Sequence, residues 1–309
     1  MNRRTFVATS LGALTAPSWS ELLGAEQKNR TRLILLGTGG GPRPRRNVAA
    51  SSQVIVANGA AYVVDCGDGV ARQMAAAGVS LTSLRNIFIT HHHSDHNADY
   101  GNLILLAWAV GLNSRLDTWG PPPLERITKL FMEMSATDID TRMSDEAHPP
   151  LVPLVRTHEI TAGGAVMDDG NVKVTAAVVP HPLMQLALAY RFDAADRSIV
   201  ISGDTAPSQS LIQLARGADV LVHEAMYLPA LDRLAARTPS AARLKEHLIA
   251  SHTSAEDAGR IAQAAGVKLL VLSHLVPADD PTITDQMWID AARAHFRGRV
   301  IVGKDLLEI

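Results

Sequence analysis

Thiols are nearly absent from this chain, whose 309 residues include a single cysteine, Cys66. One cysteine excludes an intramolecular disulfide and a structural zinc site built from several thiolates. Aromatic residues are also scarce, at 4%, so we expect a mostly aliphatic core. A basic excess is missing too: the formal net charge is -2, and this balance gives no electrostatic sign of a nucleic-acid partner.

The N-terminal segment lacks the uninterrupted apolar run of about 20 residues that a membrane anchor requires, because Pro17 and several serines break it. It has the layout of a twin-arginine export signal instead, with Arg3 and Arg4 ahead of a run of small and apolar residues. We therefore expect residues 1–27 to be a signal peptide that directs one domain, residues 28–309, to the periplasm or out of the cell. The alternative is an ordinary flexible terminus that carries two arginines.

Aliphatic strand candidates alternate with helical candidates from Thr31 onward, and such interleaving is typical of layered α/β folds. The strand candidates are short, rich in Val and Ile, and cover 32–37, 52–57, 61–65, 86–90, 172–179, 198–203, 219–223, 268–274 and 299–303. The helical candidates are 99–112, 124–134, 207–216, 228–247, 255–265 and 284–296.

The glycine-rich stretch GTGGGPRPRRN (37–47) invites comparison with nucleotide-binding loops. A dinucleotide fingerprint opens a helix directly after its strand, and the prolines that follow here disfavour such a start. We expect a tight turn whose backbone approaches a functional site closely. Arg43, Arg45 and Arg46 either meet an anionic substrate or are solvated, and solvation is the preferred interpretation.

Histidine is concentrated in THHHSDH (90–96), which holds a third of the chain's 12 histidines. In extended chain, residues two apart project to the same side, so His91 and His93 can share one ion. Where the chain turns toward a helix, Asp95 and His96 can face a neighbouring ion. His92 then points elsewhere and serves in packing or hydrogen bonding. The alternative is a surface loop that happens to be rich in histidine.

Three further residues favour a metal site over that alternative. His181, Asp204 and His274 each stand at the end of a strand candidate, in VVPHP, SGDT and LSHL. Side chains at the ends of adjacent strands converge on one edge of a sheet. The combined set therefore predicts a binuclear metal site.

These residues carry a resemblance to the metallo-β-lactamase superfamily, and to its ribonuclease Z and arylsulfatase-like branch. LGTGGGPRPRRN, VVDCGDG, THHHSDH, SGDT, VHEA and SHTSAEDAGRIAQAAGVKLLVLSH resemble that branch from Thr31 to the C-terminus. The resemblance implies a four-layer αββα sandwich in a single domain, with the site along one edge of the two sheets. It also implies that one ion is held by His91, His93 and His181, the other by Asp95, His96 and His274, with Asp204 bridging.

The resemblance and the donor types together imply two divalent ions and a hydrolase. All seven donors are nitrogen or oxygen, which makes zinc the first choice and manganese or iron the alternatives. A hydroxide shared by the ions would be the nucleophile, oriented by Asp95, and Asp65 would hold a ligand histidine from behind. Glu224 in HEA matches the residue that supports a proton-donating histidine in the branch, and His252 in HTS matches that histidine. The alternative for Glu224 is a helix cap or a surface ion pair.

The substrate expected at this stage is a small ester, a phosphodiester or an aryl sulfate, with no nucleic acid and no membrane anchor. The branch's tRNA-gripping arm lies between the residues that match His181 and Asp204, and that interval has no room for one here. A β-lactamase or lactonase, a ribonuclease Z-type endonuclease and a non-catalytic metal-binding protein remain alternatives. Homodimerisation is left open.

Overall fold

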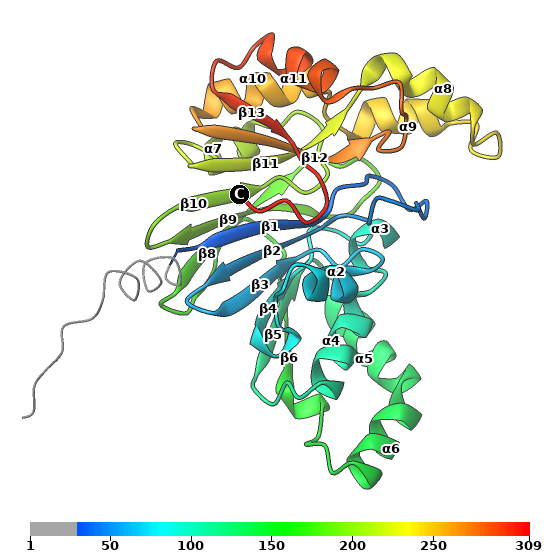
Figure 1. Cartoon of the computed structure of the whole chain (residues 1–309), viewed down its shortest axis with the longest axis vertical. Helices are drawn as coiled ribbons and strands as arrows, with labels where there is room; N and C mark the ends of the chain where they lie inside the picture. Colours follow the sequence, from blue (N-terminus) through cyan, green and yellow to red (C-terminus); the bar gives the residue numbers. More distant parts are fainter. Residues whose placement is uncertain (1–29) are drawn as a thin grey trace, which may run out of the picture.

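Two mixed β-sheets lie face to face at the centre of the computed structural model, which describes residues 30–309 (Figure 1). The first sheet has the strand order β1 (Arg32–Gly37), β2 (Ser52–Ala57), β3 (Ala60–Val64), β4 (Leu84–Phe88), β5 (Leu116–Gly120) and β6 (Val155–Glu159). Its pairing is antiparallel from β1 to β3 and parallel from β3 to β6. The second sheet runs from its parallel to its antiparallel side as β13 (Arg299–Val302), β12 (Leu269–Val276), β11 (Val220–Met226), β10 (Ser198–Ile201), β9 (Ala187–Ala194), β8 (Val172–Val179) and β7 (Gly164–Asp168).

Helices cover the outer face of each sheet. The first sheet packs against α2 (Val70–Ala76), α4 (Tyr100–Ala109), α5 (Leu124–Met134) and α6 (Ala136–Asp145), and the short α3 (Ser94–Asn97) precedes α4. The second sheet packs against α7 (Gln209–Leu214), α10 (Ala255–Ala265) and α11 (Asp285–Arg293), with α8 (Leu231–Ala236) and α9 (Leu244–Ser251) beside them (Figure 1). The predicted four-layer αββα sandwich is confirmed.

Strand β9 shows why the sheets are apolar on both faces. Successive side chains of a strand point to opposite sides, so Leu188, Tyr190 and Phe192 enter the core between the sheets while Ala187 and Ala189 face the helices. The few aromatic residues concentrate here: the ring of Phe88 lies 5.3 Å from Tyr190 and 5.1 Å from Phe192. A chain poor in aromatics therefore places several of them in the inter-sheet core.

The interval between His181 and Asp204 contains only β9, β10 and their turns, as the sequence indicates. One helix expected at 228–247 is instead divided into α8 and α9. The break contains Pro239, which lacks an N–H donor and disfavours helical backbone in the residue before it. The break separates the two segments, so that α9 packs as a helix of its own.

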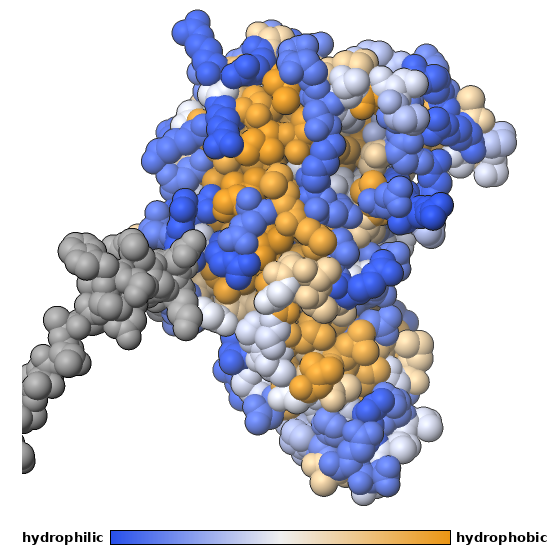
Figure 2. Space-filling model, in the orientation of Figure 1, coloured by the Kyte–Doolittle hydropathy of each residue, from blue (hydrophilic) through white to orange (hydrophobic). Residues whose placement is uncertain are grey.

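Within residues 30–309, every helix is too short or too polar to cross a membrane. Figure 2 shows hydrophobic residues gathered over the strands on the face in view, and hydrophilic residues along much of the outline. The predicted signal peptide, residues 1–27, falls outside the described residues and stays a prediction.

The close packing of α10 on α11 generates a stability prediction. A Cβ added at Gly259 would lie 2.1 Å from the backbone oxygen of Ala292. Gly259→Ala should therefore lower the free energy of unfolding by about 1–3 kcal/mol through overpacking, although alanine is the better helix former. The control is Ala264→Gly on the exposed side of α10, which should cost about 1 kcal/mol from helix propensity alone. A Gly259→Ala variant that is more stable than wild type in urea titrations would contradict this account.

Candidate metal centre

The predicted ligands come together where the strands of both sheets end. They reach the same edge from the segment after β4, from α3, from the ends of β8 and β10, and from within β12. These ligands are His91, His93, Asp95, His96, His181, Asp204 and His274. Ligand sites in α/β sheets commonly lie beyond the carboxyl ends of strands. The fold thus assembles residues that are up to 183 positions apart in sequence, counted from His91 to His274.

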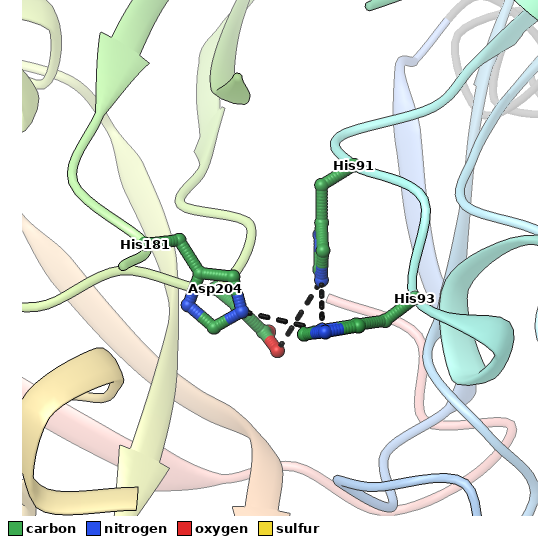
Figure 3. A group of neighbouring side chains, drawn as sticks. All are labelled: His91, His93, His181 and Asp204. Carbon is green, nitrogen blue, oxygen red and sulfur yellow. Dashed lines mark hydrogen bonds and ion pairs between the residues drawn. The ribbon is translucent and has the colours of Figure 1, made fainter. Parts of the chain in front are cut away.

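One group consists of His91, His93, His181 and Asp204, whose candidate ligand atoms all lie within 4.8 Å of one another (Figure 3). His93 Nδ1 is 3.0 Å from His91 Nε2 and 3.2 Å from His181 Nε2. Asp204 Oδ2 completes the group at 3.8 Å from His91 Nε2. Three imidazoles and one carboxylate facing a common point form a donor set suited to a divalent transition metal.

The second group consists of Asp95, His96 and His274, again within 4.8 Å. Asp95 Oδ2 lies 3.2 Å from His274 Nε2 and 3.7 Å from His96 Nε2. Asp204 Oδ2 also reaches this group, at 3.3 Å from His96 Nε2 and 3.2 Å from His274 Nε2. Asp204 therefore stands between the two groups, in the place that a bridging carboxylate would take.

Unpartnered buried atoms test whether metal ions fit these groups. Among the described residues, His96 Nε2, Asp204 Oδ1 and His274 Nδ1 are buried without a hydrogen-bond partner. Buried polar atoms are nearly always satisfied, so three exceptions in one cluster call for an explanation. Divalent cations at this cluster would satisfy His96 and Asp204 directly, and the residues present fit such ions.

Contacts behind the ligands fix their orientation. Asp65 Oδ2 lies 2.7 Å from His96 Nδ1, and the same carboxylate accepts hydrogen bonds from the backbone and hydroxyl of Thr90. His181 Nδ1 donates to the carbonyl of Ser251 at 3.0 Å. A carboxylate or carbonyl at Nδ1 fixes the tautomer that leaves Nε2 free for a metal.

His274 is aimed at the site by an irregularity in β12. The pairing of β11 with β12 passes from Glu224–Ser273 to Ala225–Leu275, which leaves His274 as the extra residue of a bulge with φ of 43°. Bulges often redirect side chains next to functional sites, and a positive φ at a residue other than glycine costs on the order of 1–3 kcal/mol. The site thus carries backbone strain that the surrounding sheet maintains.

The glycine-rich loop approaches the site as closely as its composition indicates. A Cβ at Gly40 would lie 2.7 Å from His274 Nδ1, and the backbone N–H of Gly41 donates to Asp95 Oδ2 at 2.7 Å. Arg45 donates to the carbonyls of Gly40 and Gly41 and so holds the loop in place. The loop is a tight turn against the ligands, as expected.

The electrostatics favour the protonation states that metals require at some ligands, and His96 is the exception. Burial lowers the pKa of His91 well below its usual value and that of His181 to about 4, so both imidazoles are neutral at pH 7. Burial opposes ionisation of Asp204, but the attraction of His274 and His96 outweighs it and holds the pKa of that carboxyl well below its usual range. Neutral His91 and His181 beside an ionised Asp204 are the forms that bind cations. Burial lowers the pKa of His96, but the charges of Asp204, Asp65 and Asp95 outweigh it and raise that pKa well above its usual value, so His96 would release a proton when a metal binds.

Glu224 and His252 form a buried pair next to Asp204. Glu224 Oε2 lies 2.9 Å from His252 Nδ1, and Glu224 Oε1 accepts a hydrogen bond from the backbone of Thr205 at 2.7 Å. Burial lowers the pKa of His252, but the charge of Glu224 and its hydrogen bond outweigh that effect and raise it to about 9. Ligand atoms of Asp204, Glu224, His252 and His274 also lie within 4.8 Å of one another. Because both Glu224 oxygens are already engaged, this residue suits a supporting role better than ligation.

His92, Cys66 and His247 lie in three different settings around the cluster. His92 points away from the cluster, with Nε2 2.8 Å from the carbonyl of Pro121, and Cys66 is a buried free thiol. His247, which no motif of the sequence singles out, lines the same cavity as the cluster. No motif around His247 could have signalled this, because its position depends on how α9 packs.

Comparisons with known proteins agree with this geometry. Residues 61–275 match the family described as "Beta-lactamase superfamily domain". Ribonuclease Z of Mycobacterium bovis (strain BCG / Pasteur 1173P2) is 34% identical over 277 residues, which cover 89% of this chain and 96% of the relative. Ribonuclease Z of Mycobacterium sp. (strain KMS) is 36% identical over 278 residues, covering 89% and 94%.

Solved structures share the fold. The short form of human tRNase Z superposes with a TM-score of 0.65 at 23% identity, covering 90% of this chain and 98% of that one. The metallo-beta-lactamase fold protein YhfI from Bacillus subtilis gives 0.66 at 22% identity, with the same coverage.

The ribonuclease names of the curated relatives correct one expectation. A small-ester substrate with nucleic acid excluded, as inferred from net charge and the short interval after His181, is wrong. The matched family, the ribonuclease Z relatives and the histidine–aspartate cluster lead to one conclusion: this chain belongs to the metallo-β-lactamase superfamily and is a hydrolase of its ribonuclease Z branch.

Proposed function

We propose that this protein hydrolyses phosphodiester bonds in RNA with the help of two divalent metal ions, zinc being the first choice. The observation that carries the proposal is the buried Glu224–His252 pair, 3.9 Å from Asp204 through His252 Nδ1, in a chain 34–36% identical to ribonucleases Z. A proton donor beside a metal cluster suits an ester whose leaving oxygen needs protonation.

The two residue groups provide places for two ions. His91, His93 and His181 would hold one ion, and Asp95, His96 and His274 the other, with Asp204 shared. Two such ions supply Lewis-acid stabilisation of the phosphoryl charge and make water a competent nucleophile near neutral pH. Zinc suits the nitrogen-rich donors, and manganese or iron are the alternatives.

The chain's own residues would handle the protons. We assign Asp95 to orienting the attacking water, because it lines the cavity beside Asp204. His252 would protonate the departing ribose oxygen, since its raised pKa keeps it cationic near neutral pH. Glu224 would hold the His252 ring through Nδ1, which leaves Nε2 as the donating atom.

The cavity in front of the cluster has a volume of about 550 Å³. Its polar side is formed by site residues, including Asp95, Asp204 and His252, and its apolar side by leucines of α8 and α9. This size admits the scissile phosphate with an adjoining nucleoside, whereas the rest of an RNA chain would extend over the rim.

Local charge around that rim supports an RNA substrate although the chain as a whole is acidic. The glycine-rich loop and the α8–α9 segment flank the cavity and carry seven cations: Arg43, Arg45, Arg46, Arg233, Arg237, Arg243 and Lys245. The same segments, with the adjacent Asp279 and Asp280, carry four acids, each of which pairs with at least one of these cations. The rim therefore has a local excess of three positive charges (seven cations less four acids), against a net charge of -2 for the whole chain. In Figure 1 the blue segment after β1 and the α8–α9 pair lie on the same side of the molecule. Net charge misleads here because a phosphate backbone responds to the local field.

The shared carboxylate generates a metal prediction. Wild type should contain two ions per chain, and Asp204→Ala should retain at most one and lose most activity, because the remaining histidines cannot balance two dications. The control is Asp285→Ala, which removes an exposed carboxylate paired with Lys304. Elemental analysis that finds one ion or none in fully active wild type would disprove the binuclear assignment.

The proton donor generates a prediction about leaving groups. His252→Ala should lower kcat/KM for RNA by about 10²–10⁴-fold, because a ribose alkoxide leaves poorly without a proton. Hydrolysis of bis(4-nitrophenyl) phosphate should suffer much less, since nitrophenolate leaves unprotonated. Glu224→Gln should show the same selectivity more weakly, and both variants should keep their metal. Equal reductions on the two substrates would assign His252 to substrate positioning instead.

The basic rim generates a prediction about salt. Arg46→Gln combined with Arg243→Gln should weaken RNA cleavage and reduce the slope of log(kcat/KM) against log[salt] by about 0.7 for each arginine–phosphate ion pair removed. Hydrolysis of bis(4-nitrophenyl) phosphate should not change. Lys129→Gln, on α5 with a side chain 78% exposed, is the matched control. An unchanged salt slope in the double variant would remove the rim from the RNA-binding surface.

A further inference from the structure

One face of α9 forms a wall of the cavity beside the metal ligands. Leu244, His247 and Leu248 line the cavity, and Ser251 follows one turn later. Their spacing of three, four and seven residues places all four side chains on the same face of a helix. His247 is the only polar ring on this stretch of apolar wall.

Packing fixes the position of that wall. Leu248 is buried in a small cluster with Met226, Leu231 and Val276, which ties α9 to α8 and to the ends of β11 and β12. At the end of α9, the carbonyl of Ser251 accepts the hydrogen bond from His181. The helix that presents His247 is therefore attached to a metal-ligand residue as well as to the core.

The His247 ring packs edge-to-face beside three rings of the candidate centre. Its ring centroid lies 6.2 Å from His93, 6.1 Å from His181 and 5.9 Å from His252. Its Nδ1 is 3.4 Å from the Ser251 hydroxyl, whereas its Nε2 has no hydrogen-bond partner among residues 30–309. When the Ser251 hydroxyl donates to Nδ1, the hydrogen of the neutral ring resides on Nε2.

We infer that His247 is a substrate-binding residue that donates a hydrogen bond from Nε2 to a non-bridging oxygen of the scissile phosphoryl group. The inference rests on the proposed phosphodiester hydrolysis. His93, His247 and His252 line the same cavity, so a phosphoryl group bound there can contact all three rings from the cavity side. Leu244 and Leu248 would pack against the adjoining nucleoside, as apolar walls with a few convergent polar groups do in ligand pockets.

Two substitutions separate a hydrogen-bond donor from a merely structural ring. His247→Gln keeps a side-chain N–H at about the reach of Nε2, whereas His247→Ala removes it. With metal content unchanged, His247→Ala should lower kcat/KM about tenfold to a hundredfold for both RNA and bis(4-nitrophenyl) phosphate, because the missing hydrogen bond goes to a charged group. His247→Gln should stay within about threefold of wild type. His295→Ala, at an exposed histidine that contacts Arg260, is the control.

Binding of inorganic phosphate to the metal-loaded protein, measured by calorimetry, gives a readout that does not depend on turnover. The Kd should rise about tenfold in His247→Ala and remain near the wild-type value in His247→Gln. If wild type cleaves no RNA but phosphate binding follows this order, the proposed RNA substrate fails and the role of His247 stands. If phosphate binding and kcat/KM are unchanged in His247→Ala, or if His247→Gln is impaired as much as His247→Ala, the role of His247 is overturned.

Discussion

A buried carboxylate among imidazole rings is the constraint on which the rest of the site depends. Asp204 Oδ2 lies 3.2–3.9 Å from ring nitrogens of His91, His96, His252 and His274. Such a carboxylate is unfavourable to bury unless cations or hydrogen-bond donors surround it. The same cluster leaves His96 Nε2 and Asp204 Oδ1 unpartnered. Divalent ions would resolve both problems at once, and the bulge at His274, the turn at Gly40 and the Asp65–His96 contact hold the donors in place around the positions that such ions would take.

The sequence predicted those parts of the fold that depend on local pattern. Strands 32–37, 52–57 and 172–179 and helices 124–134 and 255–265 have the expected bounds, because their apolar spacing and end signals are strong. Strands β5, β6 and β7 went unrecognised. For β6 and β7 the reason is that both strands are short and partly exposed and carry little apolar alternation. The division of α8 from α9 depends on Pro239, a single residue within an otherwise helical pattern.

The candidate site was predictable where residues carry a motif and unpredictable where tertiary packing decides. THHHSDH and the strand-end residues indicated the cluster, and the structure brings all seven together. Nothing in the sequence distinguished His247 from His295, because the packing of Leu248 in its apolar cluster with residues of α8, β11 and β12 places His247 at the cavity. Net charge failed as a guide to the substrate for a related reason: it averages over a surface on which the cavity rim is basic.

The predicted export signal and the proposed RNA substrate together limit which RNA the enzyme would meet. An exported enzyme would meet RNA outside the cytoplasm and not precursor tRNA, whereas an enzyme retained in the cytoplasm would meet precursor tRNA. Metal-dependent RNA cleavage can be measured by incubating the purified full chain with an end-labelled structured RNA before and after chelation. We expect cleavage that is lost with the chelator and restored by added zinc or manganese. Intact RNA under all of these conditions, from protein shown to contain two ions, would contradict metal-dependent RNA cleavage.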